Sequence, residues 1–120
     1  MDNKVGNNMK IVHNKLIRDN IPEIIERDNK TCKVRVLDDA EYLACLKDKL
    51  LEEGNEVKNA SDRSEVIKEI ADVLEVLDAI KSCYGITDEE VITVKNKKVS
   101  SNGAFNKRLF LEYVEKKDVQ

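Results

Sequence analysis

Apolar residues recur every three or four positions along two long stretches of the chain, which are separated by the short break Ala60-Ser61-Asp62. This period predicts two amphipathic helices, over about residues 41–59 and 63–84. Asp38 or Asp39 caps the first helix, with Glu41 three residues after Asp38 in a capping-box-like relation, and Gly85 ends the second. Because the break between them is short, we expect the two helices to lie antiparallel.

Two shorter helices and two strands complete the pattern. One helix is predicted over residues 22–27, where Pro22 suits the first turn. Another is predicted over about residues 87–99, because Thr87-Asp88-Glu89-Glu90 is a capping box. Residues 33–37 alternate polar and apolar side chains, and the comparable run is residues 108–114. The sequence therefore predicts a mainly α fold, an antiparallel helical bundle with a small two-stranded β element formed near the chain ends.

The composition indicates one soluble domain. The chain has 120 residues, of which 41% are hydrophobic and 38% charged, and this balance is typical of globular proteins. We expect a disordered tail over residues 1–8, a single domain over 9–116 and a C-terminal tail over 117–120. The net charge of -3 provides no basic field for polymeric nucleic acid. No apolar run approaches the ~20 residues of a membrane span, and no signal-peptide core precedes the domain, so a cytoplasmic location is expected.

Four acidic residues form two pairs, one pair in each long helix, and the members of a pair are three positions apart. A spacing of three places both side chains on the same face of a helix. Two of the four, Glu53 and Glu69, fall inside the apolar stripes and not on the solvent side. The four acids are Glu53, Glu56, Glu69 and Asp72. A buried carboxylate must be protonated, paired with a cation or bound to a metal, and Lys49 is the one obvious basic residue on these faces.

The residue types favour a hard cation. Carboxylate oxygens suit Mg²⁺ or Mn²⁺, whereas zinc prefers histidine and cysteine. The chain has a single histidine, His13, and three cysteines without a CxxC motif. An isolated ExxE is more simply interpreted as part of surface salt bridges. Two such pairs with core-facing members favour the metal interpretation.

The motif Glu53-x-x-Glu56 followed by Glu69-x-x-Asp72 resembles the ExxE and ExxD signature of the all-α MazG-like nucleoside triphosphate pyrophosphohydrolase superfamily. Residues 14–25, 41–43, 49–53 and 69–76 are similar to its compact phosphoribosyl-ATP pyrophosphohydrolase-like branch. That branch usually has Gly-Gly-Phe after its last helix, where this chain has Gly103-Ala104-Phe105.

The resemblance implies a MazG-like helical bundle that assembles as a homodimer or homotetramer. It implies Mg²⁺, or Mn²⁺, held by Glu53, Glu56, Glu69 and Asp72. The implied reaction is the hydrolysis of a nucleoside triphosphate, often a non-standard one, to the monophosphate and pyrophosphate in a house-cleaning role. Glu52 and Glu53 are the candidate catalytic residues, since Glu52 could hold a second ion or orient water.

Four basic residues are candidates for binding substrate phosphates: Lys15, Arg18, Lys49 and Lys97. Lys15 and Arg18 suit solvent exposure and phosphate binding equally well by residue type. Lys97, with Lys95 and Lys98, is also explained by the favourable charge at a helix C-terminus.

Two alternatives to the pyrophosphohydrolase of non-standard nucleotides stay open. The same acids would serve the phosphoribosyl-ATP pyrophosphohydrolase of histidine biosynthesis. From a different class, the chain would be a non-catalytic helical oligomer that binds nucleotide or uses a metal structurally. Gly54, in the middle of a predicted helix beside the acids, suggests close helix approach or room for a ligand.

Overall fold

The structure, a computed structural model, describes residues 9–118, and this part of the chain forms four helices and no strand. The helices are α2 (Ile21–Arg27), α3 (Asp39–Asn59), α4 (Arg63–Tyr84) and α5 (Asp88–Asn102). The mainly α prediction is therefore confirmed, and each predicted helix exists. Within residues 9–118, no helix combines the length and the apolarity needed to cross a membrane. The tail expected at residues 1–8 lies outside the described residues, as do residues 119 and 120 of the C-terminal tail.

The chain divides between Tyr84 and Gly85 into two compact units. The first unit contains α2, α3 and α4, and the second contains α5 and the residues that follow it. The single domain expected over residues 9–116 stays a prediction.

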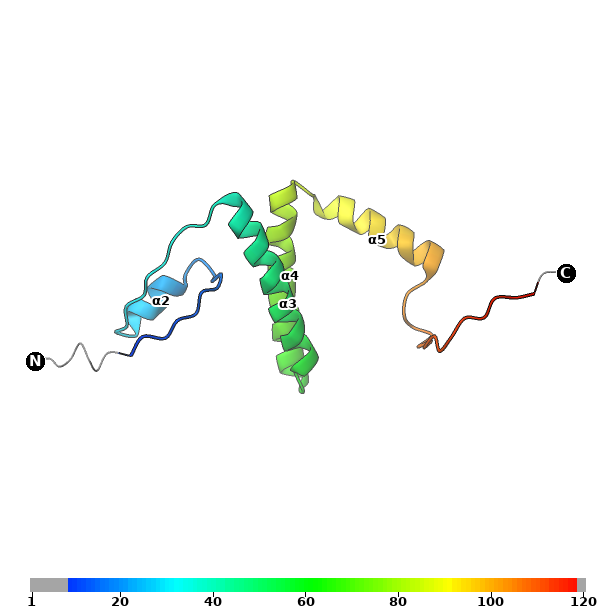
Figure 1. Ribbon diagram of the computed structural model, residues 1–120, viewed down its shortest axis with the longest axis horizontal. Coiled ribbons are helices and arrows are strands. Elements are labelled where there is room, and N and C mark those ends of the chain that lie inside the picture. Colours follow the sequence, from blue (N-terminus) through cyan, green and yellow to red (C-terminus); the bar gives the residue numbers. More distant parts are fainter. Residues whose placement is uncertain (1–8, 119–120) are drawn as a thin grey trace, which may run out of the picture. The chain divides into compact units, whose positions relative to one another are not determined.

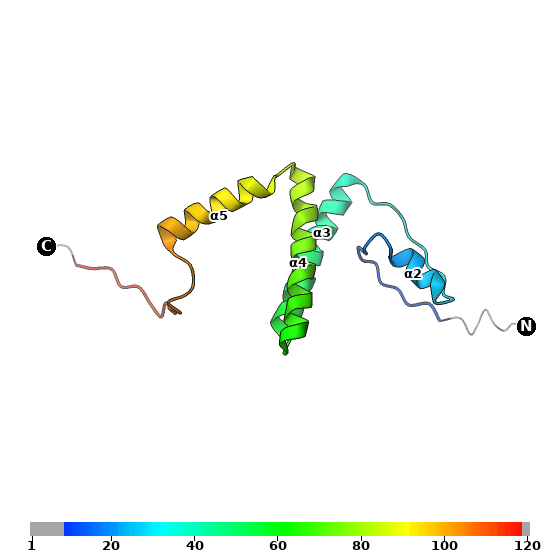
Figure 2. The ribbon, with the colours of Figure 1, turned by 180° about the vertical axis from the view of Figure 1, so that it is seen from behind.

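Helices α3 and α4 form an antiparallel hairpin around the break at residues 60–62, and within the first unit they are the one pair of described helices in contact (Figures 1 and 2). Side-chain caps fix where each helix begins. The Asp38 carboxylate accepts a hydrogen bond from the Glu41 backbone N–H at 2.8 Å, and the Glu41 carboxylate accepts one from the Asp38 N–H, so the predicted capping box is confirmed. The Asp62 carboxylate accepts a bond of 2.8 Å from the Glu65 N–H at the start of α4.

The contact between α3 and α4 follows a seam with alternating spacings of three and four residues. On α3 the seam comprises Leu43, Leu46, Leu50, Glu53 and Val57; on α4 it comprises Val66, Glu69, Val73, Val76 and Ile80. Leu46 and Val76, which are 3% and 8% exposed, are the buried apolar residues of the described chain. Both lie fifteen residues from Ser61. Since an antiparallel hairpin brings together residues at equal distances from its turn, these two positions define the register.

The predicted two-stranded β element is absent from the described residues. Residues 33–37 and 108–114 have no regular secondary structure, and Val36 and Phe110 are almost fully exposed. The alternating pattern was misleading because a strand is stable only when a neighbouring strand completes its hydrogen bonds. Other interactions occupy these segments: Arg35 donates two hydrogen bonds to the Glu41 carboxylate, and Arg108 sits in a turn at φ 61°.

The second unit consists of α5 and an irregular tail. Thr87 and Glu90 make the predicted capping box: the Thr87 hydroxyl accepts from the Glu90 N–H and the Glu90 carboxylate accepts from the Thr87 N–H. The Thr87 N–H and the Thr87 hydroxyl both donate to the Glu90 carboxylate, and these two bonds lower the pKa of Glu90. The helix continues past the predicted end at Val99 and stops at Gly103, whose φ of 86° few other residues adopt. Lys97 therefore lies within α5, and no basic residue occupies its last turn.

Gly54 lies on the exposed side of α3, and a Cβ atom added there would meet no atom of residues 9–118 within 4 Å. Close helix approach, one of the two explanations offered for this glycine, is therefore wrong. Gly85 is equally open but has a φ of +64°. The two glycines thus differ in backbone conformation and not in available space.

We expect Gly54→Ala to raise the free energy of unfolding by about 0.5–1 kcal/mol, because alanine is the better helix former and no neighbour has to move. The matched control, Gly85→Ala, should lower it by about 1 kcal/mol, because the left-handed backbone disfavours a Cβ atom. Urea unfolding followed by circular dichroism measures both. A destabilised Gly54→Ala variant would contradict the open environment of this position.

Candidate metal centre

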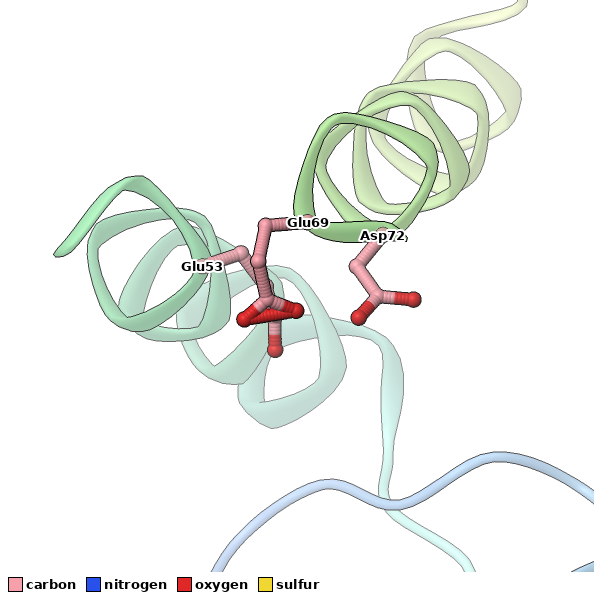
Figure 3. A group of neighbouring side chains, drawn as sticks. All are labelled: Glu53, Glu69 and Asp72. Atoms are coloured by element: carbon pink, nitrogen blue, oxygen red, sulfur yellow. The ribbon is translucent and has the colours of Figure 1, made fainter. Parts of the chain in front are cut away.

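Three carboxylates from the two hairpin helices converge at one point. Glu53 comes from α3, and Glu69 and Asp72 come from α4; one oxygen of each lies within 4.8 Å of the others. Figure 3 shows the three side chains directed into the same space between the helices. The cluster thus contains both members of the acidic pair of α4 and one member of the pair of α3.

The register of the hairpin creates this cluster. Glu53 and Glu69 each lie eight residues from Ser61, so the antiparallel arrangement places them opposite one another in the seam. Asp72 follows Glu69 by three residues and therefore projects from the same face of α4. The seam is apolar elsewhere, which makes these two glutamates an exception in the contact between the helices.

Burial and mutual repulsion make the charged forms of two acids costly. Glu53 is only 9% exposed, and its burial, together with the negative charge of Asp72, raises its pKa despite the opposing effect of Lys49. Loss of water contact and the charge of Glu56 raise the pKa of Glu69. A cation between the carboxylates would remove this repulsion, which is the electrostatic requirement of a metal site.

Glu56 and Glu52, the other two acids of interest, lie outside the group of three. The carboxylate of Glu56 is exposed, although its charge still acts on Glu69. Both oxygens of Glu52 face lysines: Oε1 lies 3.4 Å from the Lys49 Nζ and Oε2 lies 3.6 Å from the Lys15 Nζ. Glu56 as a ligand and Glu52 as a catalytic residue stay predictions.

Three of the four basic candidates pair with these acids. Arg18 donates a hydrogen bond of 2.8 Å from Nη2 to Oδ1 of Asp72. Lys49 lies 3.9 Å from Glu53 Oε1 as well as near Glu52. Lys97 belongs to the second unit, and its role in phosphate binding stays a prediction. The segment before α2, where Lys15 and Arg18 lie, is thus part of the site.

A shallow pocket of about 80 Å³ lies between this segment and α3. Its lining includes Asn14, Lys15, Lys49 and Glu52. Sequence reasoning missed Asn14 as a lining residue; it adopts a φ of 46°, which asparagine tolerates better than most residues. The direct pairing of Arg18 with a predicted metal ligand was also missed, because nothing local relates two residues so far apart in sequence.

The donor set fits a hard divalent cation. Glu53, Glu69 and Asp72 offer oxygen ligands alone, and the described residues bring no histidine or cysteine into the group. Carboxylates of this kind hold Mg²⁺ or Mn²⁺, with water completing the coordination.

Comparison with known proteins finds no relative. No family model, curated protein or solved structure matches the chain. The MazG-like resemblance therefore rests on the motif residues themselves.

We expect Glu53→Gln to stabilise the protein increasingly as the pH rises above 4.5, the ordinary pKa of glutamate. The pKa of Glu53 is raised in the folded state, so its contribution to stability is present below the unfolded-state pKa and is lost as the pH rises through the folded-state value. Glutamine carries no charge and avoids this loss. Melting temperatures in metal-free buffer from pH 4 to 8 measure the effect.

The matched control for this prediction is Glu75→Gln, on the exposed face of α4. It removes the same charge without relieving a buried one, so its melting temperature should follow that of the wild type. If the melting temperatures of the Glu53→Gln variant and the wild type depend on pH in the same way, burial does not raise the pKa of Glu53.

Proposed function

We propose that the protein is a Mg²⁺-dependent nucleotide pyrophosphohydrolase. The reaction cleaves the α–β phosphoanhydride bond of a nucleoside triphosphate, most suitably a non-standard one, and releases the monophosphate and pyrophosphate. The observation that carries this proposal is the convergence of Glu53, Glu69 and Asp72 from two helices, inside an otherwise apolar seam. The resemblance to MazG-like enzymes, drawn from the sequence, assigns the same three residues to metal binding.

The basic residues around the cluster support a phosphorylated substrate. A bound divalent cation would supply charge neutralisation of the triphosphate and a more acidic attacking water. Glu53, Glu69 and Asp72 would hold that cation. Lys15, Arg18 and Lys49 supply donors for phosphate oxygens beside it. In this proposal Glu52 positions the two lysines through its carboxylate oxygens.

The alternative functions differ in substrate or in chemistry. A phosphoribosyl-ATP pyrophosphohydrolase breaks the same type of bond, so the acids would serve it equally well. A non-catalytic oligomer would bind nucleotide or metal without turnover. A pyrophosphate-release screen over standard, modified and phosphoribosyl nucleotides with Mg²⁺ distinguishes the three. If no substrate gives pyrophosphate release while Mg²⁺ still raises the melting temperature, the non-catalytic oligomer would be favoured.

We expect Glu53→Gln and Glu69→Gln each to lower Mg²⁺-dependent turnover by more than about 100-fold, since even residues behind metal ligands cost 10- to 100-fold when changed. An amide cannot replace an anionic ligand, although it leaves the helices intact. Pyrophosphate release measures turnover, and circular dichroism checks folding. The control Glu75→Gln should keep wild-type turnover. Full activity in both cluster variants would overturn the proposed site.

We further propose that the enzyme is a homo-oligomer. A second apolar stripe runs along α4 beside the seam with α3, with spacings of three and four residues. Its members, all exposed, are Ile67, Ile70, Leu74 and Leu77. With Leu46 and Val76 as the buried apolar residues of the described chain, this stripe needs cover, and a second copy of the same helix offers it symmetrically.

We expect the mass in solution to exceed the 13.7 kDa of one chain at micromolar concentration. Leu74→Lys, in the centre of the stripe, should shift the protein towards the monomer, because a lysine there would lose hydration in the interface. Light scattering measures both. The control, Ser82→Lys on the polar face of α4, should leave the mass unchanged. A monomeric wild type would rule this assembly out.

A further inference from the structure

The segment that precedes α2 contributes two basic side chains, and each pairs with an acid on a different helix of the hairpin. Lys15 pairs with Glu52 of α3, and Arg18 pairs with Asp72 of α4. Arg18 is placed by a turn: its backbone C=O accepts a hydrogen bond of 3.2 Å from the Ile21 N–H, which begins α2. The ion pair between Arg18 and Asp72, at 2.8 Å, is the shorter of the two and involves a member of the acidic cluster.

Because of this ion pair, Arg18 would compete with a metal cation for the Asp72 carboxylate. Two positive charges on either side of one Asp72 carboxylate repel each other, so each weakens the attraction of the other for it. The side chain of Arg18 is 59% exposed and that of Asp72 is 30% exposed. Arg18 thus has room to leave Asp72, and solvent makes its departure inexpensive.

Phosphate offers Arg18 a better partner than the carboxylate does once a cation is present. The planar guanidinium can donate two parallel hydrogen bonds to a phosphate group, whose charge exceeds that of Asp72. A phosphate bound at the cation would lie beside Asp72 and hence within the reach of Arg18.

We propose that Arg18 exchanges partners during binding: it holds Asp72 until a divalent cation takes that carboxylate, and it then donates to a phosphate of the substrate. This inference rests on the proposed function and adds a coupling between its two ligands. Arg18 opposes the cation when it binds alone and favours the phosphate that follows. Cation and nucleotide therefore bind cooperatively, and by reciprocity each raises the affinity for the other.

The test measures the two ligands separately with Arg18→Ala. Calorimetric titration with Mn²⁺ alone should show binding about 1.4- to 5-fold tighter than in the wild type, the range that an exposed ion pair of about 0.2–1 kcal/mol allows. At saturating Mn²⁺, the α,β-methylene analogue of adenosine triphosphate should bind about tenfold or more weakly, because a charge-assisted hydrogen bond is lost. Arg18→Gln, which keeps most of the side chain, should behave in the same way.

The matched control is Arg35→Ala. It also removes an arginine from an exposed ion pair, but its partner, Glu41, lies outside the cluster. Its affinities for Mn²⁺ and for the analogue should equal those of the wild type. A rise in Mn²⁺ affinity together with a fall in affinity for the analogue is expected of the Arg18 variants alone, because loss of a merely structural residue would weaken both.

The outcomes separate this inference from the proposed function. Unchanged or weaker Mn²⁺ binding in both Arg18 variants would overturn the exchange of partners while leaving the metal site intact. Unchanged binding of the analogue would show that Arg18 does not reach phosphate, and it would overturn the exchange as well. A wild type that binds no Mn²⁺ at all would overturn the proposed function together with this inference.

Discussion

The placement of two glutamates opposite one another in the contact between α3 and α4 is the constraint on which the site depends. A helical hairpin normally fills its seam with apolar side chains, because every buried carboxylate costs free energy unless it is compensated. Here Glu53 and Glu69 occupy equivalent positions on either side of Ser61, and Asp72 adds a third charge. The raised pKa values of Glu53 and Glu69 are the electrostatic consequence of that arrangement.

The basic side chains around the cluster offset part of this cost without entering it. Lys49 lies at 3.9 Å from Glu53, and Arg18 approaches Asp72 from a segment far away in the sequence. Such partially exposed pairs contribute little to stability individually. The proposed phosphorylated substrate would give these basic side chains a further, negatively charged partner.

The hairpin also leaves apolar surface exposed to solvent. Its seam buries Leu46 and Val76, whereas the second stripe of α4, around Leu74, stays exposed. A single pair of helices has only one shared face, so a helix that is apolar over two faces requires another partner. The candidate site and the proposed assembly thus involve the same helix: one face of α4 carries the acids, and a neighbouring face carries the exposed apolar stripe.

Local signals in the chain were enough to predict the helices and the faces on which their acids lie. Period, caps and the break at residues 60–62 are local signals, and they predicted α3 and α4 closely, together with the inward position of Glu53. Features that depend on residues far apart in the chain could not be predicted in this way. The strands predicted at residues 33–37 and 108–114 are absent because a strand requires a partner that a local pattern cannot guarantee. The pairing of Arg18 with Asp72 likewise arises only when the segment before α2 meets α4.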